Sequence, residues 1–149
     1  MKIEELMVRE VALIDPESPV AEAAERMRAL GVGSLPVVDR LGRPVGIVTD
    51  RDIVTRCDAY GRDTYVARVG EVMSPHIVSC YTDEDVDTVA RAMVAHHVRR
   101  MPVVGRADGR VTGIVSVDDL AECTDFQALV GQLLHAGSRT HPSGRGGTA

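Results

Sequence analysis

Two short stretches of the chain carry a hydroxyl residue and an aspartate at matching positions. They are Gly46-Ile47-Val48-Thr49-Asp50-Arg51-Asp52 and Gly113-Ile114-Val115-Ser116-Val117-Asp118-Asp119. The apolar run in each is typical of the end of a buried strand, and the hydroxyl residue is typical of a helix start. A helix N-terminus offers N–H groups to an anion. The aspartate one turn further on can accept hydrogen bonds from a diol such as a ribose.

The same spacing also fits a capping box, which needs no ligand. In a capping box the hydroxyl of the N-cap residue and the acid three positions later satisfy the first N–H groups of a helix. For either stretch taken alone, we favour this structural interpretation. It does not explain why the glycine and the apolar lead-in occur twice.

Two further apolar segments are each preceded by a short stretch, and only one of these two stretches contains basic residues. One stretch reads Leu30-Gly31-Val32-Gly33-Ser34-Leu35-Pro36, and the other reads His96-His97-Val98-Arg99-Arg100-Met101-Pro102. We interpret His96 and His97 as a solvated helix end that complements the helix dipole. Arg99 and Arg100 interrupt an apolar junction, and arginine favours bidentate contacts with anions. We therefore predict that this arginine pair contacts a phosphate.

A duplication supplies the elements that position these groups. A shift of 66 positions aligns Met73 with Met7 and Pro102 with Pro36, and after a one-residue insertion a shift of 67 aligns the two aspartate stretches. Internal repeats of this kind indicate two copies of one structural unit. We predict repeats at residues 1–60 and 68–124, joined by a linker at 61–67.

Each repeat is predicted to have the order β-α-β-β-α. In the first repeat these elements are expected at residues 11–14, 19–30, 35–39, 45–48 and 49–57. Ser18 is the expected N-cap of the first helix, with Pro19 at its first position, and Gly31 is expected to end it. In the second repeat strands are expected at 77–80, 101–104 and 110–115. Helices are expected after a cap at Thr82 and Asp85 and again from residue 116.

The predicted fold class is α+β, with the two repeats packed sheet to sheet about a pseudo-twofold axis. A unit of about 60 residues buries too little surface to be stable alone, so the copies should pack on each other. This symmetry predicts two equivalent clefts. Residues 125–135 are predicted to form an additional amphipathic helix, and residues 136–149 are predicted to be disordered.

Composition narrows the classes of function. The chain has 149 residues, a net charge of −5 and three cysteines, Cys57, Cys80 and Cys123. The acidic balance argues against nucleic acid as a partner. No apolar run is long enough to span a membrane, and the polar N-terminus lacks the features of a signal peptide. The scattered cysteines fit buried thiols in the cytoplasm. No motif for catalysis or for a metal site is present, so neither is predicted.

Over residues 1–124 the sequence resembles a pair of cystathionine-β-synthase (CBS) domains, the arrangement called a Bateman module. The resemblance rests on the two aspartate stretches together with Leu35-Pro36-Val37-Val38 and Met101-Pro102-Val103-Val104. It implies a non-catalytic regulatory module of the stand-alone type. It also implies an adenosine-containing regulatory ligand, either AMP, ADP, ATP or S-adenosylmethionine, rather than a catalytic cofactor. Such modules usually form homodimers, and the resemblance leaves open whether they also bind a further protein.

The resemblance also implies a role for each class of site residue. The aspartate holds the ribose, the hydroxyl residue lies near ribose or phosphate, apolar residues sandwich the adenine, and basic residues of the other repeat hold phosphate. One cleft would then use Asp52, Thr49, Ile47, Val11, Ala12, Val32, Arg99 and Arg100. The second cleft would use Asp119, Ser116, Ile114, Ile77, Val78 and Val98, with the uncharged Gly33 and Ser34 at its phosphate positions. The second cleft is therefore expected to take an uncharged tail or no ligand.

Two functions remain open at this point. The leading hypothesis is a sensor that binds an adenosine compound between the repeats. The rival hypothesis is a ligand-free interaction or stress-associated scaffold, in which the aspartates only cap helices.

Overall fold

The computed structural model of the chain describes residues 1–122. The predicted helix at 125–135 and the predicted disordered tail at 136–149 lie outside the described residues. Within the described part, no helix is both long enough and apolar enough to cross a membrane.

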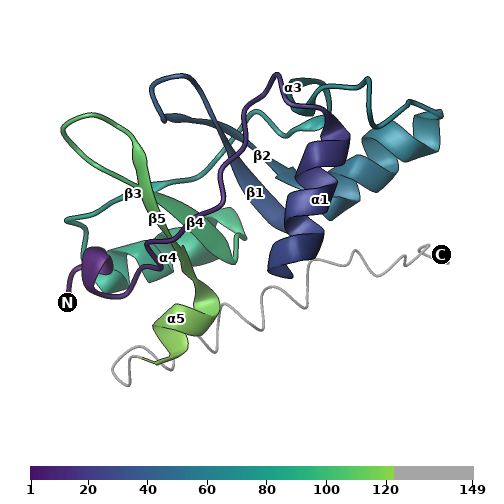
Figure 1. Cartoon of the computed structure of the whole chain (residues 1–149). Coiled ribbons are helices and arrows are strands. Elements are labelled where there is room, and N and C mark those ends of the chain that lie inside the picture. The colour runs from purple at the N-terminus through teal and green to yellow at the C-terminus, as the bar shows by residue number, and fades with distance from the viewer. Residues whose placement is uncertain (123–149) are drawn as a thin grey trace, which may run out of the picture.

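The order of elements confirms two β-α-β-β-α repeats in an α+β fold (Figure 1). The first repeat contains α1 (Val20–Leu30), β1 (Ser34–Val38), β2 (Pro44–Thr49) and α2 (Asp50–Asp52), which continues as a π-helical turn (Ile53–Cys57) and a 3-10 turn (Asp58–Tyr60). The second contains β3 (Cys80–Tyr81), α4 (Val86–His96), β4 (Arg100–Val104), β5 (Val111–Ser116) and α5 (Val117–Ala121). A 3-10 turn (Ile3–Glu5) and α3 (Val69–Val72) precede the respective repeats.

The two hairpins are built alike. β1 pairs antiparallel with β2, β4 pairs antiparallel with β5, and β3 runs parallel to β4. The registers match, because Pro36 lies opposite Ile47 and Pro102 lies opposite Ile114. Each hairpin packs on the apolar face of its own long helix, which explains the helical spacing of apolar residues in the sequence. The predicted face of α4 is buried, and consists of Val86, Val89, Ala90 and Met93.

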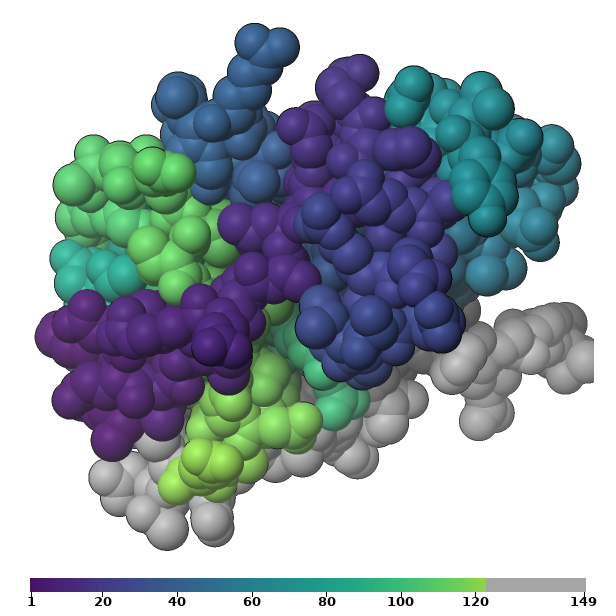
Figure 2. All heavy atoms as spheres, in the orientation of Figure 1, coloured from purple at the N-terminus to yellow at the C-terminus, as the bar shows by residue number. Residues whose placement is uncertain are grey.

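Each repeat sends its first segment onto the other repeat. Ile3 and Met7 are buried in the core of the second repeat, and Val69 and Val72 are buried in the core of the first. In Figure 2 the N-terminal segment, in purple, lies across the front of the molecule between the green second repeat and α1. This exchange joins two cores that would each be marginal alone into one folded unit.

The helix caps differ from those predicted, and the exchanged segments are the reason. α1 begins at Val20 with Pro19 as its N-cap, not Ser18, and the N-cap of α4 is Asp85 rather than Thr82. Neither cap side chain bonds to its helix. The first N–H of each helix instead donates to the crossing segment, from Val20 to the carbonyl of Ala67 and from Val86 to that of Met1. Backbone carbonyls from a distant part of the chain therefore replace the side-chain caps.

The first strand of each repeat is shorter than predicted. Within 11–14 only Ile14 forms a bridge, parallel to Val37. In the second repeat the strand shifts from the predicted 77–80 to Cys80–Tyr81. Among the residues before these bridges, Ala12 packs against the core of the first repeat and Val78 packs against the core of the second.

The described cysteines are buried free thiols, as predicted. Cys57 and Cys80 lie in the two cores. Burial, with a smaller contribution from the nearby Glu84 carboxylate, raises the pKa of the Cys80 thiol to about 12. This thiol therefore stays protonated near neutral pH and packs as a small apolar group.

His97 ends α4 in a conformation that normally favours glycine. Its φ is 54°, and among residues 1–122 no other non-glycine residue has a positive φ. The equivalent position of α1 is Gly31, with φ 66°. We expect His97→Gly to raise the free energy of unfolding by about 0.5–1 kcal/mol, because it removes the left-handed strain of a side chain. Thermal unfolding followed by circular dichroism measures the change.

The neighbouring histidine provides the control for this substitution. His96 is the last residue of α4 and has helical geometry. His96→Gly should lower the stability, because glycine is unfavourable within a helix. If both glycine variants shift the melting temperature in the same direction, the explanation by φ is wrong.

Candidate functional site

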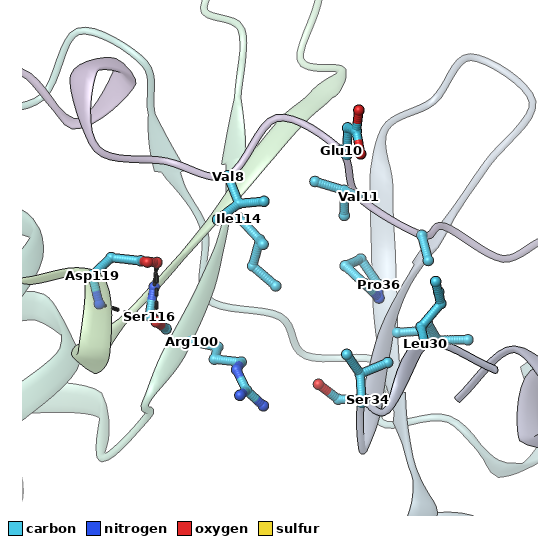
Figure 3. Close-up of a pocket in the computed structure, with 13 residues that line it drawn as sticks. Val8, Glu10, Val11, Leu30, Ser34, Pro36, Arg100, Ile114, Ser116 and Asp119 are labelled. Carbon is cyan, nitrogen blue, oxygen red and sulfur yellow. Dashed lines mark hydrogen bonds between the residues drawn. The ribbon is translucent and has the colours of Figure 1, made fainter. Parts of the chain in front are cut away.

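A cavity of about 340 Å³ lies between the two repeats (Figure 3). Segments from both repeats line it: the N-terminal segment, the end of α1, β1 and, from the second repeat, β4, β5 and α5. The lining residues are Val8, Glu10, Val11, Ala12, Leu30, Val32, Ser34, Leu35, Pro36, Arg100, Ile114, Ser116 and Asp119. The site therefore exists only because the two copies pack on each other.

The N-terminal segment provides the apolar wall. Val8 pairs with Ile114 through two backbone hydrogen bonds of 2.9 and 3.0 Å, which hold the segment along β5. Val11 and Ala12 follow at once, and Figure 3 shows Val11, Pro36 and Ile114 around the same open space. A flat aromatic ring such as a nucleobase could be enclosed between these aliphatic side chains.

Ser116 and Asp119 form the polar wall. Asp119 Oδ2 accepts hydrogen bonds from the backbone N–H of Ser116 at 2.7 Å and from its hydroxyl at 3.0 Å, and Asp119 N–H donates to the Ser116 hydroxyl at 3.3 Å. This is the predicted capping box. Within residues 1–122 the second oxygen, Oδ1, has no hydrogen-bond partner. A half-buried carboxylate oxygen beside an apolar hollow can accept a hydrogen bond from a sugar hydroxyl.

Two arginines extend the cavity at one end. A smaller hollow of about 260 Å³ is lined by Arg99, Arg100, Ser116, Val117 and Asp118. It shares Arg100 and Ser116 with the larger cavity, so the two hollows adjoin at these residues and are together called the groove. Neither arginine forms an ion pair with any residue in 1–122, and both are exposed. The lining of the two hollows thus combines aliphatic side chains, the guanidinium groups of Arg99 and Arg100, and the carboxylates of Glu10, Asp118 and Asp119.

The equivalent residues of the first repeat make the same cap with different surroundings. Asp52 Oδ2 accepts from the Thr49 N–H at 3.0 Å, and Asp52 N–H donates to the Thr49 hydroxyl at 3.0 Å. Asp52 is only 8% exposed. Its Oδ1 lies 3.8 Å from Nε of Arg56. The capping interpretation therefore describes both repeats, but only Asp119 lines the cavity described above.

The structure groups the predicted site residues differently from the sequence analysis. Val11, Ala12, Val32 and Arg100 were predicted to share a cleft with Asp52, but they line a cavity with Asp119. Ile114, Ser116 and Asp119 stay together as predicted, and are joined by the charged Arg100. The other predicted site residues do not line this cavity: Asp52, Thr49, Ile47, Ile77, Val78 and Val98. Arg99 lines the adjoining hollow.

The exchange of segments is the physical reason for this regrouping. Because Val8 pairs with Ile114, residues 8–12 lie beside the second repeat. Ser74 pairs in the same way with Ile47, so the segment before Ile77 lies beside the first repeat. Sequence reasoning missed five lining residues, namely Val8, Glu10, Leu30, Leu35 and Pro36. The last three lie within predicted elements and the first two lie just before one, and no motif marks any of them as part of a site.

Family models of known proteins match both halves of the chain. The model described as the CBS domain matches residues 3–58 and again residues 69–124. This chain belongs to the CBS domain family. The tandem arrangement confirms the pair predicted from the repeated motifs.

Individual relatives of this CBS pair agree with the assignment. The CBS domain-containing protein YhcV of Bacillus subtilis is 37% identical over 119 residues, which cover 80% of this chain and 82% of YhcV. The crystal structure of Hypoxic Response Protein I with two coordinated zinc ions matches with a TM-score of 0.75 and 30% identity, covering 83% of this chain and 98% of that one. The CBS domain pair of protein MJ0100, crystallised with 5′-methylthioadenosine and S-adenosyl-L-methionine, matches with a TM-score of 0.69 and 26% identity, over 85% and 98% of the two chains.

The described part of this CBS pair offers no grouping of three or more histidine, cysteine or acidic residues that could hold a metal ion. His96 and His97 are both exposed at the end of α4, where His97 serves as its C-cap.

Proposed function

We propose that this CBS pair is a regulatory sensor that binds an adenosine-containing ligand in the cavity between its repeats. The observation that carries the proposal is the set of groups that line the groove. Aliphatic side chains suit a base, the available carboxylate oxygen of Asp119 suits a sugar, and Arg99 and Arg100, which form no ion pair within residues 1–122, suit a phosphate. The adenosyl ligands of the related MJ0100 pair support the same chemical class.

Each group has a role in this proposal. Val11, Ala12 and Val32 enclose the base, together with Ile114 from the second repeat. Asp119 accepts a hydrogen bond from the ribose, and Ser116 holds the Asp119 carboxylate in place. Arg99 and Arg100 contact phosphate. The assignment makes AMP, ADP or ATP a better fit than S-adenosylmethionine, because the amino-acid tail of the latter carries a positive ammonium group.

The ligand would act by changing the relative stability of two arrangements of the repeats. The cavity is lined from both repeats, so a bound ligand stabilises the arrangement that closes on it. A homodimer or a separate protein would detect that change. No reacting group is assigned, and the proposed role is regulatory rather than catalytic, in the cytoplasm.

The rival function is a scaffold that needs no ligand. The capping boxes formed in both repeats favour it, because they give both aspartates a structural role. The two functions differ in a direct titration. Isothermal titration calorimetry of the purified chain with AMP, ATP and S-adenosylmethionine should detect binding of at least one compound if the sensor proposal holds, and of none if the chain is a scaffold.

A substitution in the apolar wall tests where the ligand binds. Val32 lines the cavity and is 37% exposed, so its replacement should leave the cores intact. We expect Val32→Glu to weaken AMP binding by about tenfold or more, because it fills the hollow and adds a negative charge near the nucleotide. The dissociation constant from calorimetry gives the effect.

Leu41→Glu is the matched control. Leu41 is also an exposed aliphatic residue, 59% exposed, and it does not line the cavity. This variant should bind AMP as the parent does. Equal loss in both variants would mean that added negative charge, rather than the cavity, is responsible, and unchanged binding in Val32→Glu would place the ligand elsewhere.

A further inference from the structure

The guanidinium group of Arg56 lies near Asp52, the aspartate of the first repeat's copy of the motif. Its Nε lies 3.8 Å from Asp52 Oδ1, and one of its terminal nitrogens donates to the backbone carbonyls of Val72 and Met73, each at 3.3 Å. Two backbone carbonyls therefore hold this side chain at ion-pair distance from Asp52. Since Oδ2 of Asp52 bonds to the Thr49 N–H, both carboxylate oxygens of Asp52 already face a donor.

The second repeat has no cation at the matching position. The shift of 67 that aligns Asp119 with Asp52 places Cys123 on Arg56. Within the described residues, Asp119 has no ion pair, and it is more exposed than the 8% exposed Asp52. The same motif thus carries a carboxylate with a neighbouring cation in the first repeat and, within the described residues, one without such a cation in the second.

The charges at the proposed phosphate positions also favour the second repeat over the first as the ligand site. In the second repeat the N–H of Val117 donates to the carbonyl of Arg99, and in the first the N–H of Asp50 donates to the carbonyl of Gly33. In the first repeat the Asp50 carboxylate therefore lies beside the uncharged Gly33. In the second repeat Val117 lies beside Arg99. Asp50 Oδ2 lies 3.1 Å from the position that a Cβ on Gly33 would occupy. A phosphate placed there would meet a negative charge.

We propose that Arg56 is an internal occupant of the Asp52 site, so that the chain binds one adenosine ligand, at Asp119. This inference rests on the proposed function and specifies which of the two related acids serves it. The duplication has produced two copies of the motif. Arg56, four residues after Asp52, gives the first copy a structural role instead of a ligand-binding one. Arg56 is a specificity-determining residue in this scheme, since it excludes a ligand from the first repeat.

Matched substitutions of the two aspartates test the assignment. Asparagine keeps the shape and one acceptor oxygen of the cap and removes the charge. With AMP in isothermal titration calorimetry, the parent should bind one equivalent per chain. Asp119→Asn should weaken binding by about tenfold or more, and Asp52→Asn should change the dissociation constant by less than about twofold. A loss confined to Asp52→Asn, or two equivalents in the parent, would overturn the inference while leaving the proposed sensor in place.

The role of Arg56 has its own measurement. Arg56→Ala frees the Asp52 carboxylate, and we expect adenosine, which has no phosphate to meet Asp50, to bind two equivalents per chain instead of one. Arg51→Ala is the control, because Arg51 is an exposed arginine of the same helical segment whose side chain makes no ion pair within residues 1–122. It should retain one equivalent. An unchanged stoichiometry in Arg56→Ala would overturn the role given to this residue.

The outcomes separate the two proposals. If neither AMP nor adenosine binds the parent chain, the proposed function fails and the inference fails with it. If Arg56→Ala does not fold, the comparison of Asp119→Asn with Asp52→Asn still decides which acid serves the ligand. Thermal unfolding of every variant, recorded alongside the titrations, identifies any loss of binding that comes from unfolding.

Discussion

Arg100→Ala is expected to weaken AMP binding by about tenfold and to leave adenosine binding within about twofold of the parent. Arg100 lines both parts of the groove and has no ion-pair partner within residues 1–122, so its charge is available to a phosphate. A hydrogen bond to a charged group contributes about 1.5–3 kcal/mol, reduced here because Arg100 is exposed to solvent, and about 1.4 kcal/mol corresponds to a tenfold change. Calorimetry with both compounds measures the difference.

The comparison of two ligands is the internal control of this experiment. Because adenosine lacks the phosphate, a loss of affinity for both compounds would show that Arg100 shapes the hollow instead of contacting the charged tail. Arg110→Ala removes an exposed arginine from the turn before β5 and should affect neither ligand. The effect of Arg100→Ala should also shrink as salt is added, since screening weakens the contact in the parent.

Gly46→Ala is expected to lower the free energy of unfolding by about 1–3 kcal/mol, the usual cost of forcing atoms into a filled site. A Cβ on Gly46 would lie 2.6 Å from the backbone oxygen of Ser74 and 2.8 Å from Sδ of Met73. Ser74 pairs with Ile47 through two backbone hydrogen bonds, so the crossing segment would have to move away from β2. Urea unfolding followed by circular dichroism gives the change in stability.

The second repeat supplies the comparison. A Cβ on Gly113 would lie 2.7 Å from Sδ of Met7 and 2.9 Å from the carbonyl oxygen of Val8. Gly113→Ala should therefore cost less than Gly46→Ala, because the backbone contact is longer and the closest atom belongs to a flexible side chain. Ser79→Ala, at an exposed position before β3, should change the stability by less than about 0.5 kcal/mol. If both glycine variants are as stable as Ser79→Ala, the segments do not cross as closely as the structure indicates.

These contacts explain a feature that neither a cap nor a ligand accounts for. The glycine that opens each aspartate motif lies where the exchanged segment crosses the hairpin. A side chain at this position would separate the two strands of that contact. The repeated glycine is therefore a packing requirement of the duplicated fold.

Local chemistry made several elements predictable from the sequence. Thr49 with Asp52 and Ser116 with Asp119 form capping boxes because three residues separate the hydroxyl from the acid, a distance set by one helical turn. Gly31 ends α1 because it adopts a positive φ. The hairpins and the buried face of α4 follow from apolar spacing, which depends only on neighbouring residues.

Contacts between distant segments could not be predicted in this way. The N–H of Val20 bonds to Ala67, and that of Val86 bonds to Met1, so the predicted caps at Ser18 and Thr82 were wrong. A spacing pattern describes which face of an element is apolar, and it carries no information on which copy of a repeat that face will meet. Val11 consequently lines a cavity with Asp119 and not with Asp52, the aspartate with which it was predicted to share a cleft.

The sequence by itself determined that this protein is a duplicated β-α-β-β-α unit with an acid after a capping hydroxyl in each copy, because periodicity, caps and turns are local properties of the chain. Only the tertiary structure decided that Val8 lies along β5, that Val11 and Arg100 share a cavity with Asp119, and that Arg56 faces Asp52. The two copies are interchangeable in a sequence alignment, and their difference arises when each exchanged segment packs against one particular hairpin.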